Sequence, residues 1–205
     1  MHPSASSSNL TSSPDVATTE FGDVLLAAQQ GAQWAIAVLW QDLHPRLLRF
    51  LRGLDPVAAE DVEADTWLVA ARDLARFRGD DQQFRAWMFT IARNRLIDWR
   101  RREARRRIVA VTPDVLGGHA AEDDPAVTAV DVLRADAAVA LVRSCLPRDQ
   151  AEVILLRVLG GLDVDEVAAI VDKRPGNVRV LQHRGLRRLA EQLSHEAPAR
   201  RGVTG

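Results

Sequence analysis

The sequence predicts an all-α fold, two small helical domains joined by a flexible linker. Apolar residues recur at helical spacing from Phe21 almost to the end of the chain. Proline and glycine fall between the periodic segments, and no stretch alternates apolar and polar residues as a half-buried strand would. A polar stretch around residues 108–130 contains Pro and Gly and divides the helical pattern into two blocks.

The composition is that of an ordinary soluble protein. The chain has 205 residues, of which 47% are hydrophobic and 27% charged, enough for one or two domains with real cores. No apolar run is long enough to cross a bilayer, and the first residues do not resemble a secretory signal. We therefore expect no membrane insertion and a cytoplasmic location. The single cysteine, Cys145, excludes an internal disulfide, and its apolar neighbours predict burial.

The first block covers residues 20–107. Residues 1–19 precede it and are rich in Ser, Thr and Pro, which predicts a disordered tail. Pro45 is expected to interrupt the helical pattern, and Phe77–Phe84 is expected to form a loop around Gly79. The apolar periodicity predicts helices over about 20–29, 34–39, 47–51, 56–74 and 84–106.

The second block covers residues 131–194 and follows a linker at 108–130. Residues 195–205 are expected to be a second disordered tail. The apolar periodicity of this block predicts four helices, at 131–145, 148–159, 163–171 and 175–193.

The last two predicted helices have the pattern of a helix-turn-helix. Asp163 is a good N-cap, and Glu166 completes a capping box. Pro175 suits the first turn of the next helix, because its missing N–H would have no partner there. Two sets of apolar residues are expected to face inward: Val164, Val167, Ala168 and Val171 on one helix, and Val178, Leu181, Leu186 and Leu189 on the next.

The outer face of the second helix has the chemistry of a recognition helix. Arginine, glutamine and asparagine can make paired hydrogen bonds to base edges in the major groove. Arg187 and Arg188, one turn further on, are better placed for phosphates. The residues expected to contact duplex DNA are Lys173, Arg174, Asn177, Arg179, Gln182, His183, Arg184 and Arg187.

Charge is segregated along the chain, although the formal net charge is only −1. Residues 55–65 contain five acids and no cation, residues 99–107 contain six arginines and one glutamate, and residues 173–188 contain no acid. Local fields steer association, so this pattern suggests two DNA contacts and one protein partner. The alternative is that these segments are merely solvated helix faces.

Several motifs in both blocks resemble extracytoplasmic-function (ECF) sigma factors of the sigma-70 family. In the first block they are Ala59-Glu60-Asp61-Val62-Glu63-Ala64-Asp65-Thr66-Trp67, Phe77-Arg78-Gly79-Asp80, Phe84-Arg85-Ala86-Trp87, Ile91-Ala92-Arg93-Asn94-Arg95, Asp98 and the basic run 100–107. In the second block they are Leu146-Pro147-Arg148-Asp149-Gln150, Val153-Ile154-Leu155-Leu156-Arg157 and Gly161-Leu162. A linker of about twenty residues leaves no room for the extra domain of larger sigma factors.

The resemblance implies binding and DNA remodelling rather than covalent chemistry. The expected partners are core RNA polymerase, promoter DNA and an anti-sigma factor. The core-binding residues would be Glu60, Asp61, Asp65, Thr66 and Trp67, with Ala64 standing where the family carries Gln. The minus-ten element would be bound as a single strand by Phe77, Arg78, Phe84, Arg93, Asn94, Arg95, Arg100 and Arg101. The helix-turn-helix would hold the minus-thirty-five element as duplex.

Two other classes of protein are alternatives to this one. A helix-turn-helix alone also fits a dimeric regulator that binds DNA without polymerase. An enzyme is disfavoured, because the five histidines are scattered and no metal spacing, nucleophile elbow or phosphate loop is present. We therefore expect no catalytic residues, no metal site and no cofactor. Trp87 lies on an apolar stripe, so a core position is the alternative to a DNA contact there.

Overall fold

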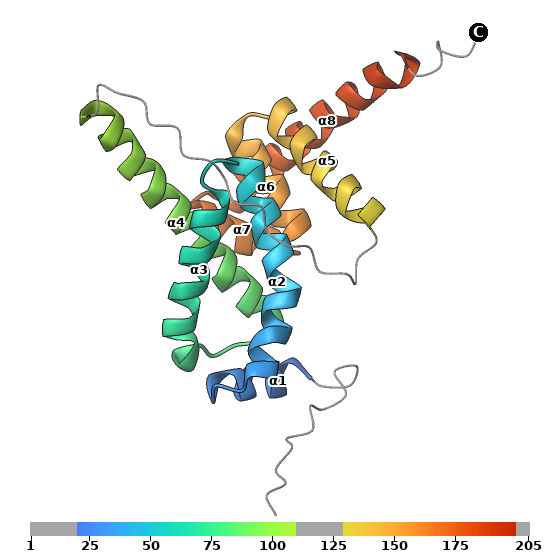
Figure 1. Ribbon diagram of the computed structural model, residues 1–205. Coiled ribbons are helices and arrows are strands. Elements are labelled where there is room, and N and C mark those ends of the chain that lie inside the picture. Colours follow the sequence, from blue (N-terminus) through green and yellow to red (C-terminus); the bar gives the residue numbers. More distant parts are fainter. Residues whose placement is uncertain (1–19, 110–128, 200–205) are drawn as a thin grey trace, which may run out of the picture.

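The computed structural model describes residues 20–109 and 129–199, and every regular element in these ranges is helical (Figure 1). This confirms the all-α prediction. The predicted tail at 1–19, most of the predicted linker (110–128) and residues 200–205 lie outside the described residues.

The first block begins with α1 (Phe21–Gln29) and α2 (Gln33–Leu54). The predicted interruption at Pro45 is wrong, because α2 continues through it. An internal proline costs a helix about 3 kcal/mol. Six large apolar side chains of α2 are buried and together outweigh that cost, at roughly 1.5–3 kcal/mol each: Leu39, Leu43, Leu47, Leu48, Phe50 and Leu51.

The block continues with α3 (Ala59–Asp73), a 3₁₀ turn η2 (Leu74–Arg76) and the long helix α4 (Asp81–Val109). The predicted loop is shorter than expected, because α4 starts at Asp81 rather than near 84. Asp80 and Gln83 set this start: the Gln83 backbone N–H donates to Asp80 Oδ1 (2.8 Å), and the Asp80 N–H donates to Gln83 Oε1 (3.0 Å). This reciprocal pair satisfies N–H groups of the first turn.

The second block contains α5 (Ala129–Cys145), α6 (Arg148–Leu159), α7 (Val164–Val171) and α8 (Pro175–Ala199). These helices correspond to the four that the sequence predicts. The last one continues beyond its predicted end near 193, and α5 begins at Ala129, inside the segment expected to be linker. Cys145 is partly buried.

The two blocks pack directly against each other. Helix α2 lies at the centre of the molecule, with α1, α3 and α4 of its own block around it and α5 and α6 of the second block on another side (Figure 1). Gly53 of α2 lies at this contact: a Cβ atom there would lie 2.6 Å from Leu155 Cδ1 and 3.1 Å from Val139 Cγ1. The buried side chains of both blocks therefore form one cluster.

No helix among the described residues combines the length and apolar character needed to span a bilayer. Within the same ranges, no group of His, Cys, Asp and Glu side chains is arranged to hold a metal ion.

Candidate nucleic-acid and polymerase interfaces

Helices α7 and α8 form the predicted helix-turn-helix, and the predicted capping box is confirmed. Asp163 Oδ1 accepts hydrogen bonds from the backbone N–H groups of Asp165 and Glu166, both at 2.8 Å. The Glu166 carboxylate accepts one from the Asp163 N–H at 2.7 Å. At the other end, Asp172 adopts a left-handed conformation (φ 54°, ψ 51°) and turns the chain toward α8. The motif is thus fixed by caps at both ends of α7.

We expect Asp163→Ala to lower the free energy of unfolding by about 1 kcal/mol, the usual cost of losing an N-cap. Asp165→Ala is the matched control, because it removes an acid from the same turn without removing the cap. Urea denaturation followed by circular dichroism measures both variants. Equal losses in the two would mean that the capping box adds nothing beyond the helix dipole.

Helix α8 presents a polar face to solvent. Asn177, Arg179, His183 and Arg184 are exposed, whereas Val178 is fully buried. The prediction that Leu186 faces inward is wrong: its side chain is 49% exposed, and Gly185 takes the inward position. A Cβ atom at Gly185 would lie 2.6 Å from Ile154 Cδ1, so α8 packs closely on α6 there. The outward face is therefore set by close helix packing.

Some of the cations on and near α8 have an acidic or polar partner within the protein, and others have none among the described residues. Lys173 pairs with Asp149 (3.0 Å), Arg187 pairs with Glu191 (3.4 Å), and Arg188 donates a hydrogen bond to Gln150. Within the described part of the chain, Arg174, Arg179 and Arg184 make no ion pair. Their guanidinium groups are free to bind an anionic or hydrogen-bonding ligand.

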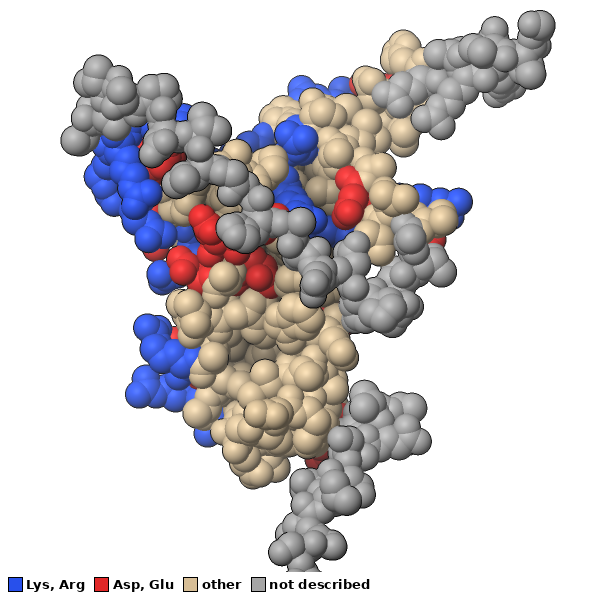
Figure 2. Space-filling view, in the orientation of Figure 1, with Lys and Arg blue, Asp and Glu red and all other residues tan. Residues whose placement is uncertain are grey.

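A second charged surface lies on α3 and α4. Figure 2 shows acidic side chains gathered beside the basic C-terminal part of α4. Asp61, Asp65, Arg102 and Arg106 line one shallow groove between these helices, and Arg102 lies 3.8 Å from Asp65. The first block thus carries acidic and basic surfaces next to each other.

Comparison with known proteins places each block in a family. Residues 39–106 match the family Sigma-70 region 2, and residues 142–189 match Sigma-70, region 4. The chain is 30% identical over 183 residues to the ECF RNA polymerase sigma factor ShbA of Streptomyces griseus, covering 85% of this chain and 96% of that relative. The chain is an ECF sigma factor of the sigma-70 family.

Two further similarities agree. The ECF sigma factor BldN of Streptomyces coelicolor is 32% identical over 172 residues; the match covers 83% of this chain but only 64% of BldN. The sigma factor RpoE of Bartonella quintana, solved with the anti-sigma factor NepR, superposes with a TM-score of 0.56 at 25% identity, over 78% of this chain and 96% of RpoE. As a sigma factor, the protein directs RNA polymerase to promoters and is not an enzyme.

Of the residues expected to bind core polymerase, the three acids on α3 are at least partly exposed, whereas Thr66 and Trp67 are bonded within α3. Asp61 is exposed, and Asp65 is half-exposed beside Arg102. Glu60 is held by Arg52, whose Nε and Nη2 both donate to Glu60 Oε1 (3.1 and 2.9 Å). Thr66 and Trp67 differ from expectation: the Thr66 side chain is buried and donates to the Val62 carbonyl, and Trp67 is partly buried and bonded to Glu63.

The aromatic residues expected to hold minus-ten bases form a cluster in which Phe84 is only 2% exposed. Phe77 and Trp87 are half-buried and pack on it, with ring centroids 5.3 and 5.6 Å away, and lie 5.0 Å from each other. Phe84 is thus part of the core, contrary to its expected DNA contact, because it fills the space beneath the other two rings. Trp87 packs against the core, which was the alternative to a DNA contact, and part of its surface remains accessible.

The cations expected near minus-ten DNA are mostly engaged within the sigma factor. Arg93 Nε donates to Glu152 Oε1 (2.8 Å), and Arg100 donates to Asp55 Oδ2 (3.0 Å) and to the Leu54 carbonyl (2.6 Å). The other three cations differ: Arg78 bonds to backbone carbonyls of its own loop, Arg95 has a buried Nε without an acceptor, and Arg101 lies 3.8 Å from Asp98. The neutral Asn94 is exposed.

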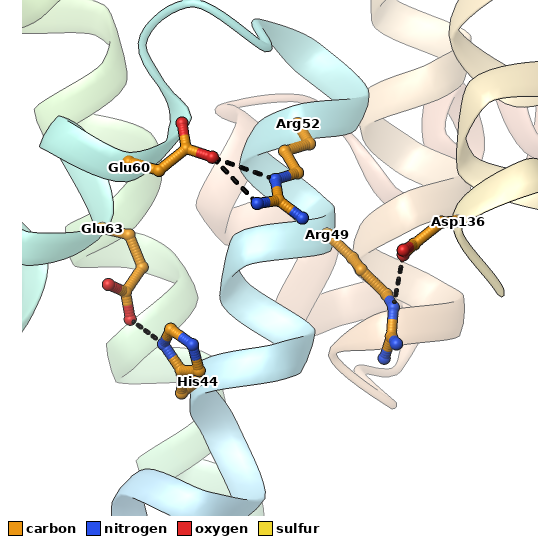
Figure 3. A network of polar contacts seen from close by, with 6 residues as sticks. All are labelled: His44, Arg49, Arg52, Glu60, Glu63 and Asp136. Carbon is orange, nitrogen blue, oxygen red and sulfur yellow. Dashed lines mark hydrogen bonds and ion pairs between the residues drawn. The ribbon is translucent and has the colours of Figure 1, made fainter. Parts of the chain in front are cut away.

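Sequence reasoning missed a polar network on α2. Figure 3 shows His44, Arg49 and Arg52 of α2 reaching in two directions, to Glu60 and Glu63 of α3 and to Asp136 of α5. Glu63 is only 8% exposed; its Oε1 lies 2.8 Å from His44 Nδ1 and also accepts a hydrogen bond from Trp67 Nε1. This carboxylate therefore holds α3 on α2.

We expect Glu63→Ala to lower the free energy of unfolding by about 1–3 kcal/mol, because the partly buried His44 and Trp67 side chains both lose their hydrogen-bond partner. Glu63→Gln is the matched variant: its amide oxygen can still accept, so it should retain most of the stability. Guanidinium denaturation measures both. Equal loss for Ala and Gln would show that the negative charge, not the acceptor, holds the helix.

Proposed function

We propose a division of labour between the two regions of this sigma factor. Region 2 binds core polymerase through the outer face of α3, with Asp61 and Asp65 at its centre and Glu60 beside them. The same region holds unpaired minus-ten bases on the loop 77–80 and the exposed side of α4. Region 4 reads the minus-thirty-five element as duplex through α8.

The observation that carries this proposal is the outward face of α8. Four polar or cationic side chains that can read base edges are exposed there: Asn177, Arg179, His183 and Arg184. Two of them, Arg179 and Arg184, make no ion pair in the described residues, so these two arginines can bind duplex DNA without breaking an ion pair. Lys173, Arg174, Gln182 and Arg187 flank this face and suit the phosphates on either side.

The assignment for region 2 rests on complementary chemistry. Asn94 and Arg101 are accessible, and Phe77 and Trp87 offer partly exposed rings on which a base can stack. Arg78, Arg93, Arg95 and Arg100 supply the cationic track, once their internal bonds exchange for phosphates. Phe84 acts beneath the surface by supporting the two rings, and Thr66 and Trp67 act by shaping α3 rather than by touching the polymerase.

We also propose a cytoplasmic location, where polymerase and promoters are found, and an anti-sigma factor as a further partner. The second proposal rests on the superposition with RpoE, which was solved bound to the anti-sigma factor NepR. Co-purification of the tagged sigma factor from its own cells, followed by mass spectrometry, tests for such a partner.

Footprinting of the reconstituted holoenzyme tests the division of labour. On a promoter fragment, the holoenzyme should protect two separate elements from DNase I and should make thymines in the downstream one reactive to permanganate. Core polymerase alone is the control and should do neither. Protection of a single palindromic site by the protein without polymerase would instead favour a dimeric regulator.

A further inference from the structure

Helix α1 is bonded to the backbone of the loop that is proposed to hold minus-ten bases. Gln29, the last residue of α1, donates two hydrogen bonds through its amide Nε2. One goes to the carbonyl of Leu74 (3.1 Å) and the other to the carbonyl of Phe77 (2.9 Å). These two carbonyls lie at either end of the turn η2, which leads directly into the loop 77–80. A single side chain therefore ties both ends of that turn to α1.

The other hydrogen bonds of this turn come from residues close to it in the sequence. The Phe77 N–H donates to the Leu74 carbonyl (3.0 Å). Arg78 Nη1 donates to the carbonyl of Ala75 (2.9 Å) and to that of Phe77 (2.6 Å). The bonds from Gln29, by contrast, span 45 and 48 positions of the chain. Gln29 therefore sets where the turn lies relative to the rest of region 2.

The same helix also supports the aromatic cluster next to the loop. Phe21, at the start of α1, packs on Phe84 with ring centroids 5.6 Å apart. Phe84 in turn packs against Phe77 and Trp87, the two rings proposed to stack on bases. Helix α1 thus contacts both the backbone of the loop and the base of its aromatic rings. The match to Sigma-70 region 2 begins at residue 39, beyond α1, so it assigns no role to this helix.

The surroundings of Gln29 are apolar. It lines a cavity of about 270 Å³ together with Leu74 and Ala75 of η2 and Phe84 of α4, and it is the one amide side chain among the lining residues. An apolar wall offers the two carbonyls no substitute donor, so a lost hydrogen bond is not replaced from that side. Methionine is close to glutamine in length and volume but has no donor. Gln29→Met therefore removes both hydrogen bonds and keeps the apolar packing.

We propose that Gln29 is a positioning residue for minus-ten recognition: its amide holds η2 so that the loop 77–80 presents Phe77 and Arg78 to an unpaired base. This inference rests on the proposed function of the loop. Arg78, Gly79 and Asp80 are exposed, so little packing holds the loop once the tie to α1 is lost. A base is then read only by the fraction of molecules whose loop is in place, and affinity for the preferred base falls by that fraction.

Hydrogen exchange of the free, full-length protein tests whether Gln29 holds the turn. A peptide covering residues 74–80 should exchange about tenfold faster in Gln29→Met than in the wild type, the order expected from the loss of two hydrogen bonds. Peptides from α2 and α3 should exchange as before, which shows that the variant is folded. Gln30→Met is the matched control, because Gln30 is the next residue and is exposed. Equal exchange of the 74–80 peptide in wild type and Gln29→Met overturns the proposal.

Base selectivity of the reconstituted holoenzyme tests the role in reading. Run-off transcription is compared between a promoter fragment that the wild-type holoenzyme recognises and fragments with single substitutions in its minus-ten element. Gln29→Met should lower the ratio between the preferred and the substituted base about tenfold at one or more positions. A variant that is merely less stable would transcribe all fragments less and leave this ratio unchanged. Gln30→Met should keep the wild-type ratio, and Gln29→Lys, which again supplies a donor, should recover most of it.

The outcomes separate this inference from the proposed function. Faster exchange with wild-type selectivity in Gln29→Met would mean that Gln29 holds the turn without serving recognition, and it overturns the proposal. So does a Gln29→Lys variant that is as unselective as Gln29→Met, because the donor would then not be what matters. A wild-type holoenzyme with no base preference at any minus-ten position contradicts the proposed function itself, while the exchange measurement still decides whether Gln29 holds the loop.

Discussion

Replacing Arg179 with alanine is expected to weaken binding to minus-thirty-five duplex roughly 5- to 150-fold, the range that corresponds to a base contact worth about 1–3 kcal/mol. Arg179 is exposed on the outward face of α8 and makes no ion pair within the described residues. Its loss should therefore leave the fold intact. Fluorescence anisotropy with promoter duplex measures the affinity, and a pull-down with core polymerase should show unchanged association.

Arg134→Ala is the matched control for Arg179→Ala. Arg134 is an exposed arginine on α5, 78% accessible, and pairs only weakly with Asp131 at 3.6 Å. Its removal takes the same charge from the protein without touching α8. If both variants lose duplex affinity equally, net charge explains the effect and α8 is not the reading surface. If Arg179→Ala loses core binding as well, the assignment of roles to the two regions is wrong.

Charge reversal at Asp61 is expected to weaken association with core polymerase by at least about tenfold, which corresponds to 1.4 kcal/mol. Asp61 is exposed on α3 and, together with Asp65, lines the groove between α3 and α4. An acidic helix face binds a partner of opposite charge, so Asp61→Arg turns an attraction into a repulsion. Titration of fluorescent sigma factor with core polymerase measures the dissociation constant.

Asp23→Arg serves as the control for Asp61→Arg. Asp23 is an exposed acid in the first turn of α1, so its reversal makes the same change in net charge at a different surface. Wild-type affinity for this variant, together with the loss for Asp61→Arg, locates the contact on α3. Unchanged core binding by Asp61→Arg would remove α3 from the interface.

Local chemistry made much of the second region predictable. The capping box at Asp163 and Glu166 and the proline at the start of α8 are signals carried by a few neighbouring residues, and they place both ends of the helix-turn-helix. The apolar character of Leu186 predicted an inward position, but its side chain is exposed. The inward position is occupied by Gly185, which sequence periodicity does not count as apolar.

Long-range packing explains what the sequence did not reveal. Pro45 was expected to interrupt a helix, but the buried leucines on either side of it hold α2 together. Glu63 was grouped with the partner-facing acids, although it shares the inner face of α3 with Val62 and Thr66 and could have been recognised by that spacing. No local signal pairs Arg93 with Glu152, because only the packing of region 4 on region 2 brings them together.

The polar stretch between the blocks predicted two domains. It did not predict that the two domains pack directly against each other. A sequence indicates which residues are apolar, and it does not say which of two cores they join. From the sequence, Leu155 and Val139 could belong to a core of region 4 alone. In the structure they also pack against Gly53 of α2. The shared core therefore depends on tertiary packing. The same packing pairs Arg93, which was expected to contact DNA, with Glu152 of region 4.

Run-off transcription tests the central claim most directly. Purified protein, core polymerase and a set of promoter fragments from the source genome should yield transcripts with one defined start site per active promoter. The same reaction should yield none with core polymerase alone and markedly less with Arg179→Ala. If the purified wild-type protein binds core polymerase yet never starts transcription at a defined site, regions 2 and 4 do not act together on a promoter as described.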